Sequence, residues 1–142
     1  MIRVTSIRHI NDEPSDEVWI IVRSLKHQVK NAKQIKVLSP SSELFGKYLQ
    51  LKKDGEWSPK SFKEIYVPDF LAQMRAQDAR KALNYLYKQD KAGKTICLAC
   101  FCPDEHLCHR SIVAGLLQGC GCNVKTDSGE SFEEYYSLFK NQ

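Results

Sequence analysis

The stretch Thr95-Ile-Cys-Leu-Ala-Cys-Phe-Cys102 is followed directly by Pro103-Asp-Glu-His-Leu107 and by Cys108-His-Arg-Ser-Ile-Val-Ala-Gly-Leu-Leu117. The first segment is apolar and of strand length, the second is short and polar, and the third has helical spacing of apolar residues. We therefore predict a buried strand, a tight loop and a helix that begins on the Cys-His-Arg-Ser run. Four of the six cysteines and two of the four histidines fall between Cys97 and His109, so we expect the chemistry here.

The rest of the chain alternates strand-like and helix-like segments around this unit. Residues 2–8 have the pattern of a first strand that suits a sheet edge, and the continuous apolar run 18–22 suits a strand buried on both faces. Residues 35–38 predict a short third strand, and residues 122–125 a short last one. Apolar spacing and capping residues predict helices over about residues 42–52, 59–66, 69–74 and 78–91, and a last helix opened by a capping box at 131–134.

Strands that alternate with helices are typical of an α/β domain with a mostly parallel sheet. At 142 residues, of which 42% are hydrophobic, the chain has the size and composition of one folded domain. We predict a single α/β domain over residues 1–142, with a three-layer α/β/α, Rossmann-like architecture and a mostly parallel sheet of about 4–5 strands. Residues 24–33 favour neither a strand nor a helix.

The sequence carries no signal for export or membrane insertion. Its longest apolar runs are too short to span a bilayer, and the start, Met1-Ile-Arg-Val-Thr5, lacks signal-peptide anatomy. We therefore expect a cytoplasmic protein without a membrane partner, in which the thiols stay reduced. Cysteines in that setting indicate metal binding, catalysis or core packing before disulfides.

The net charge of +4 is mild, but the positive charge is unevenly distributed. The stretch 23–36 contains no acidic residue and five basic ones: Arg23, Lys26, Lys30, Lys33 and Lys36. Such a stretch is usually a solvated face. It also supports an alternative function, a nucleic-acid-binding accessory protein that uses the basic 23–36 face, or it steers an anionic ligand toward a neighbouring site.

The segment Cys102–Ala114 resembles the hallmark of the bacterial domain-of-unknown-function family numbered 488 (DUF488). Members of that family carry an apolar strand ending in Cys, a short acidic loop, and Cys-His-Arg at the opening of a helix, here residues 108–110. Residues 20–24 resemble the second strand of the family, in which Ile21 takes the place of a usual Asp. The resemblance covers residues 18–117, and it implies a fold and candidate residues more than a reaction.

Ligands of open parallel sheets bind beyond the carboxyl ends of the strands. Two predicted strands end at Arg23 and Cys102, and the helix that starts at residues 108–111 lies beside them. The unpaired N–H groups and dipole of a helix start favour an anion, while Arg110 and Ser111 add a cationic fork and a hydroxyl. We expect Arg23, Arg110 and Ser111 to hold a small phosphate or nucleotide-like ligand. For each arginine, the alternative is a purely structural contact.

Two thiols are candidates for reactivity at this site. A helix start and nearby cations lower the pKa of a thiol, and Cys102 and Cys108 have His106, His109 and Arg110 as neighbours. Either thiolate can act as a nucleophile with His109 as the proton carrier, so we consider Cys102, Cys108 and His109 as catalytic candidates. The alternative is inert core packing, because free cysteines are commonly buried. The sequence does not decide whether the chain is an enzyme.

A third reading is a zinc-binding protein. Cys100, Cys102, Cys108 and His109, with His106 as the alternative imidazole, supply soft ligands within ten residues. Against this reading, the chain has no Cys-x2-Cys knuckle followed by a second pair. Strand alternation also sends Cys97 to the face opposite Cys100. We therefore assign no metal and no cofactor from the sequence, and the oligomeric state stays open.

Overall fold

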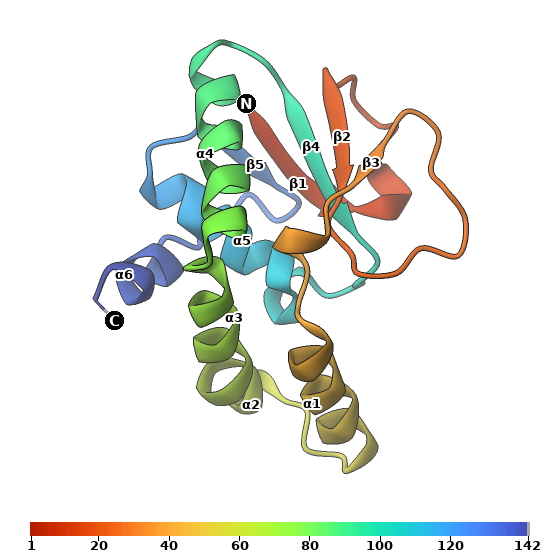
Figure 1. Ribbon diagram of the computed structural model, residues 1–142, viewed down its shortest axis with the longest axis vertical. Helices are drawn as coiled ribbons and strands as arrows, with labels where there is room; N and C mark the ends of the chain where they lie inside the picture. The colour runs from red at the N-terminus through yellow and green to blue at the C-terminus, as the bar shows by residue number, and fades with distance from the viewer. Residues whose placement is uncertain (142) are drawn as a thin grey trace.

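The computed structural model describes residues 1–141 and shows an α/β fold built on one sheet (Figure 1). The strands are β1 (Ile2–Ser6), β2 (Glu17–Ile20), β3 (Lys33–Gln34), β4 (Ile96–Cys100) and β5 (Val124–Thr126). The five strands lie in the order β3-β2-β4-β1-β5, and every pair is parallel. This confirms the predicted α/β class with a parallel sheet, and it is consistent with a three-layer α/β/α architecture.

The helices of the structure are α1 (Ser42–Lys53), α2 (Pro59–Ser61), α3 (Val67–Met74), α4 (Gln77–Lys91), α5 (His109–Gly119) and α6 (Glu134–Lys140). The starts of α1 and α2 follow the capping rules that the sequence indicates. The Ser41 hydroxyl accepts a hydrogen bond from the N–H of Leu44, and Ser58 and Ser61 form a capping box at α2. A π-helical turn, Phe62–Tyr66, joins α2 to α3.

Three predictions about local structure are wrong. The strand β1 is not an edge strand, because β4 and β5 pair with it on either side and all five of its residues are buried. The third strand ends at Gln34, and residues 36–38 form a 3₁₀ turn instead. The helix α6 lacks the expected capping box: its N-cap is Glu133, and no side chain caps it. Residues 24–32, for which the sequence favoured neither type, form neither strand nor helix.

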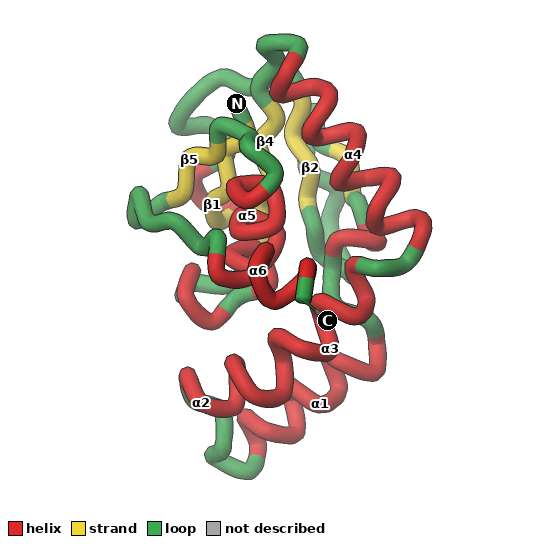
Figure 2. Tube along the Cα trace, turned by 90° about the vertical axis from the view of Figure 1, so that its left-hand side faces the viewer, coloured by secondary structure: helices red, strands yellow, loops and turns green. Residues whose placement is uncertain are grey.

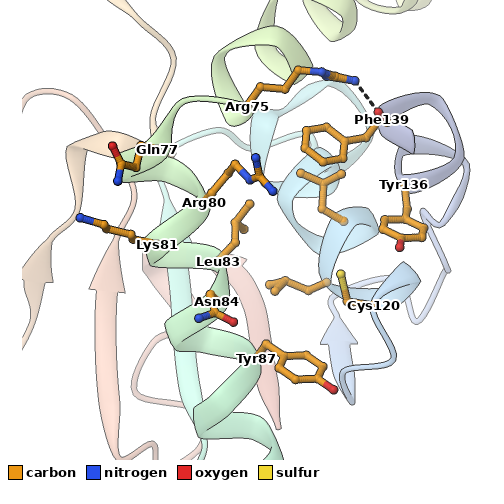
Figure 3. Close-up of a pocket in the computed structure, with 12 residues that line it drawn as sticks. Arg75, Gln77, Arg80, Lys81, Leu83, Asn84, Tyr87, Cys120, Tyr136 and Phe139 are labelled. Carbon is orange, nitrogen blue, oxygen red and sulfur yellow. Dashed lines mark hydrogen bonds between the residues drawn. The ribbon is translucent and has the colours of Figure 1, made fainter. Parts of the chain in front are cut away.

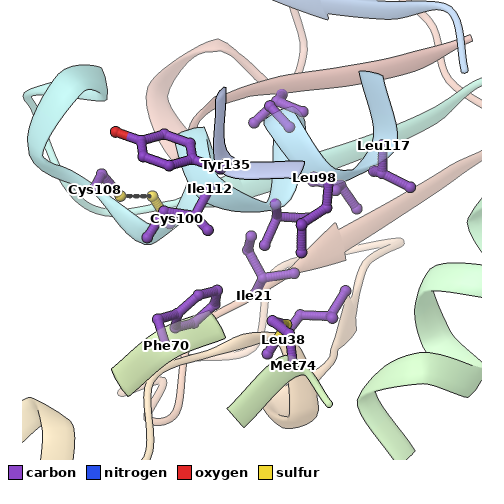
Figure 4. Close-up of a cluster of buried hydrophobic side chains, with 14 of the residues drawn as sticks. Ile21, Leu38, Phe70, Met74, Leu98, Cys100, Cys108, Ile112, Leu117 and Tyr135 are labelled. Carbon is purple, nitrogen blue, oxygen red and sulfur yellow. Dashed lines mark hydrogen bonds between the residues drawn. The ribbon is translucent and has the colours of Figure 1, made fainter. Parts of the chain in front are cut away.

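The core lies between the sheet and the helices that pack on it. All five residues of β4 are buried, as is the continuation of β2 at Ile21. Figure 4 shows Ile21, Leu98 and Ile112 close to Phe70 and Met74, which come from α3. Burial of a side chain of this size stabilises the fold by about 1.5–3 kcal/mol. The apolar run that the sequence places in β4 is therefore the centre of the packing.

Several helices gather at one end of the sheet. The strands run toward α1, α2 and α3, which gather beyond the carboxyl ends of the strands (Figures 1 and 2). The start of α5 lies at the same end, directly after β4 and its loop. No helix among residues 1–141 combines the length and apolar character needed to cross a membrane.

Candidate metal centre and adjoining cavity

A cluster of three thiols and one imidazole forms where β4 ends and α5 begins. Cys100 is the last residue of β4, Cys102 follows in the loop, and Cys108 is the N-cap of α5. The Sγ atoms of Cys100 and Cys108 are 3.1 Å apart, a contact drawn in Figure 4, and the Nδ1 of His109 is 3.6 Å from the Cys108 Sγ. The four potential ligand atoms of this cluster, including the Cys102 Sγ, all lie within 4.8 Å of one another.

The position of Cys97 agrees with the alternation of side chains along β4. Its Sγ contacts the guanidinium of Arg3 at 3.4 Å and takes no part in the cluster. Burial raises the pKa of the Cys97 thiol, which therefore stays neutral. Cys97 is thus a core residue, as the pattern predicts.

The imidazole of His109 is held in one orientation by the backbone of a neighbouring strand end. Its Nε2 lies 2.7 Å from the carbonyl oxygen of Ile21. Because a carbonyl only accepts, Nε2 must carry the proton, and Nδ1 is left with its lone pair toward the thiols. Burial lowers the pKa of His109, which favours this neutral form.

Arg110 points into the protein and not into open solvent. It is 1% exposed, and its Nη1 donates to the Cys100 Sγ at 3.3 Å and to the carbonyl oxygen of Cys102. Its Nη2 lies 3.7 Å from the Asp127 carboxylate. The guanidinium therefore holds the loop after β4 against α5 and places a positive charge on the cluster.

The three thiols of the cluster shift one another's pKa values, and Cys100 is the one that loses its proton most readily. Hydrogen bonds from the thiols of Cys102 and Cys108, together with one from the Arg110 guanidinium, hold the pKa of Cys100 far below its usual range. The same shared interaction raises the pKa of Cys102 to about 11. Burial is the main cause that raises the pKa of Cys108. The proximity of the Arg110 guanidinium therefore favours the thiolate form at Cys100.

A cavity of about 270 Å³ opens beside the cluster. The half-buried Cys102 lies in its wall with Cys108 and His109, and Arg23 also lines it. Four aromatic side chains complete much of the remaining surface: Phe45, Tyr48, Tyr66 and Phe101.

Tyr66 reaches this cavity from the π-helical turn. The N–H of Val67 donates to the carbonyl of Phe62, five residues back, and Pro68 follows immediately. Proline has no N–H and its ring crowds the preceding turn, which explains the wider turn at this point. Burial raises the pKa of Tyr66 well above its usual range, so its hydroxyl stays neutral beside the cluster.

The structure brings some predicted site residues together and separates others. Arg23, Cys102, Cys108 and His109 line one cavity, as expected for residues at the carboxyl edge of the sheet. Arg110 and Ser111 do not line it. The Ser111 hydroxyl and N–H both donate to the Cys108 carbonyl, at 2.8 and 3.0 Å. Anion binding by Arg110 and Ser111 stays a prediction, because the contacts of both are internal.

Two features of the site were not visible in the sequence. The first is the carbonyl of Ile21 as the partner of His109, for which a backbone atom leaves no sequence signal. The second is the aromatic wall, although Tyr66 two residues before Pro68 hints at a distorted helix. His106, the alternative imidazole, lies apart and contacts the Glu130 carboxylate at 2.9 Å. It is therefore not a member of the cluster.

A comparison with known families identifies a matching family model. The family model DUF488-N3a, described as the active DUF488-N3 subclade, matches residues 2–121, which include every residue of the cluster and of the cavity. No curated protein and no solved structure matches the chain.

Proposed function

The chain belongs to the DUF488 family, and from that premise we propose that it holds a zinc ion through Cys100, Cys102, Cys108 and His109. The observation that carries this proposal is the convergence of three sulfur atoms and one imidazole nitrogen within 4.8 Å. Thiolate and imidazole are the ligands that zinc prefers, and a four-ligand set of this kind gives tetrahedral coordination.

The distances in the cluster suit such an ion. Zn–S bonds of about 2.3 Å and Zn–N bonds of about 2.0 Å place the ligand atoms of a tetrahedron about 3.5–3.8 Å apart. The Cys108 Sγ and the His109 Nδ1 are 3.6 Å apart. The Cys100 and Cys108 sulfurs, at 3.1 Å, need only a small outward movement. Side-chain rotations of that size leave β4 and α5 in place.

The surroundings of the cluster also support a metal. A metal-bound histidine usually donates its other N–H to a carbonyl or carboxylate, as the His109 Nε2 does to Ile21. Three thiolates, a neutral imidazole and a divalent cation sum to a charge of about −1. The buried guanidinium of Arg110, in contact with the Cys100 sulfur, offsets that charge. A buried charge with such a partner avoids the cost of isolation.

A second candidate is thiol-dependent catalysis on a small anionic ligand. One observation favours it: Cys102 is the thiol of the cluster that is not fully buried, and it lines the same cavity as Arg23. In this reading, Cys102 is the thiol that meets the ligand, and Arg23 holds the anion. Because the pKa of Cys102 is raised to about 11, its reaction requires transfer of the thiol proton to a neighbouring group such as Cys108 or His109. The description of the matched family model as active supports a catalytic role. Nucleic-acid binding by the basic 23–36 face has no such supporting observation.

Metal analysis of the purified protein tests the lead proposal. We expect about one equivalent of zinc per chain, and loss of most of it in Cys100→Ser and Cys108→Ser. Cobalt substitution should give the intense near-ultraviolet absorption of thiolate-to-cobalt charge transfer. The matched control is Cys120→Ser, because Cys120 is exposed and lies outside the cluster. It should keep the metal.

Different experimental outcomes would contradict the metal proposal and support the thiol candidate. A protein that takes up much less than one equivalent after zinc loading contradicts the metal proposal. If the same protein is alkylated selectively at Cys102, and a bound anionic ligand slows that reaction, the thiol candidate gains support. Equal metal content in the wild type and in both cluster variants would also exclude these thiols as ligands.

A further inference from the structure

We propose that the cavity beside the cluster binds a small ligand in which a planar aromatic ring is joined to one anionic group, of the nucleoside-monophosphate class. The inference deepens the proposed function by naming the ligand of the same site. It rests on the proposed function only in that the residues of the metal centre form part of the cavity lining. The ring lies against the aromatic wall, and the anionic group contacts Arg23.

The aromatic wall is exposed in a way that favours a planar partner. Phe45 is 45% exposed and Phe101 is 53% exposed, and both line the cavity. Tyr48 and Tyr66 lie deeper, with ring centroids 6.5 Å apart in an edge-to-face arrangement. Aromatic side chains around a concave surface provide stacking and edge contacts for a planar ring, largely independent of its substituents. This wall therefore selects for ring shape.

Arg23 is prepared to receive an anion at the same cavity. Its Nε donates to the Pro40 carbonyl at 2.9 Å, which orients the guanidinium. The amide of Gln34 donates to the carbonyls of Val22 and Arg23, at 3.1 and 2.9 Å, and so holds the backbone. Among residues 1–141, neither Nη group of Arg23 has a hydrogen-bond partner or an ion pair. A planar guanidinium whose two Nη groups are free can donate to two oxygens of one phosphate or carboxylate.

The charges around the cavity point the same way. No aspartate or glutamate lines it, and Arg23 is its one lining lysine or arginine. Lys26 and Lys30 follow Arg23 in the chain and are exposed, but they do not line the cavity. A single lining cation favours a ligand with one anionic group over a ligand with several.

The size of the cavity sets the upper limit of the ligand. The volume of about 270 Å³ is slightly smaller than that of typical small-molecule sites, which begin at about 300 Å³. That space accommodates a ring with a short linker and one anionic group. It is too small for a dinucleotide, and a base-paired nucleic acid presents no free ring to the aromatic wall.

The protein offers an internal control surface. A larger groove of about 760 Å³ runs between α4, α5 and α6, and it shares no lining residue with the cavity (Figure 3). Arg80 projects into that groove from α4 and is exposed. Arg80→Ala therefore removes the same charge as Arg23→Ala, but from a different site.

Calorimetric titration of the full chain tests the inference with four kinds of probe: the nucleoside 5′-monophosphates, the corresponding nucleosides, inorganic phosphate and an aromatic carboxylate such as benzoate. We expect at least one ring-bearing anion to bind about tenfold more tightly than its nucleoside or than phosphate alone. Arg23→Ala should remove that advantage, and Phe101→Ala should weaken binding about fivefold or more. Arg80→Ala should leave it unchanged. Preference for benzoate over every nucleotide would overturn the assignment to the nucleoside-monophosphate class.

Several outcomes would overturn the inference. One is a dissociation constant above about 1 mM for every ring-bearing anion. The others are binding that is unchanged in Arg23→Ala and binding that is lost in Arg80→Ala. Circular dichroism of each variant verifies the fold. Metal content measured on the same samples separates this inference from the proposed function. If the protein is fully loaded with zinc and binds none of the probes, only the ligand proposal is overturned. If the protein takes up no zinc and still binds the probes, only the metal proposal is overturned.

Discussion

The Nε2 of His109 lies 2.7 Å from the carbonyl oxygen of Ile21, although 88 positions separate the two residues in the chain. This contact ties the first turn of α5 to the end of β2. It also fixes the tautomer of the imidazole, so that Nδ1 faces the three thiols. One hydrogen bond thus connects the stability of the fold to the geometry of the site.

The first prediction concerns this hydrogen bond. In His109→Ala, the Ile21 carbonyl loses its partner and a buried void forms, so we expect the free energy of unfolding to fall by about 2–4 kcal/mol. The same variant should lose most of its bound zinc. Urea unfolding with metal analysis measures both. The exposed His27→Ala is the control, and equal stability of the two variants would contradict the role given to His109.

The second prediction concerns the buried guanidinium of Arg110. Truncation in Arg110→Ala removes the donors to the Cys100 sulfur and the Cys102 carbonyl, together with the ion pair to Asp127. We expect a loss of about 3 kcal/mol in the free energy of unfolding, because hydrogen bonds to charged groups are lost in a buried place. The exposed Arg80→Ala should change stability by less than about 0.5 kcal/mol in the same urea titration. A similar, small effect of both variants would show that Arg110 is dispensable.

The third prediction concerns the close approach of α5 to the segment that precedes α6. A Cβ atom at Gly115 would lie 2.0 Å from the carbonyl oxygen of Phe132, so one of the two segments must move. Gly115→Ala should therefore destabilise the protein by about 1–3 kcal/mol. Gly46 is exposed within α1 and has no atom within 4 Å of that position. Gly46→Ala should raise the free energy of unfolding by about 0.5–1 kcal/mol, since alanine is the better helix former. Thermal unfolding of both variants distinguishes backbone contact from helix propensity.

The fourth prediction concerns pH and the carboxylate of Glu17. The Tyr85 hydroxyl is the main cause that lowers the pKa of Glu17, followed by the Trp19 indole and the Lys33 ammonium. A lowered folded-state pKa means that Glu17 contributes stability above its unfolded value of about 4.5 and loses it as the pH falls through the folded value. The difference in stability between wild type and Glu17→Gln should therefore be largest at neutral pH and shrink below about pH 4.5.

Urea unfolding over a series of pH values measures this difference. The control is Glu56→Gln, because Glu56 is exposed and has no ion pair among residues 1–141. Its stability difference from the wild type should stay near zero at every pH. A difference for Glu17→Gln that grows on acidification would reverse the assigned direction.

Local patterns in the sequence were enough for most of the elements. The apolar run before Cys102 predicts β4, and the alternation of strands and helices predicts the parallel sheet. Ser41 and Ser58 mark helix starts correctly, because a cap depends on the few residues that follow it. The sequence was misleading for the place of β1 in the sheet, since strand order depends on pairings between distant segments.

For the candidate site, too, the sequence predicts the residues and the tertiary structure determines their contacts. The sequence by itself determined the thiols, the imidazole and the two arginines, and it placed them at one edge of the sheet through the rule for parallel strands. Only the tertiary structure decided that Cys100 joins Cys102 and Cys108, that Arg110 faces inward while Arg23 faces the cavity, and that Ile21 orients His109. The physical reason is that spacing along the chain fixes which face of an element a side chain occupies, whereas its partners come from packing between β2, β4, α1 and α5.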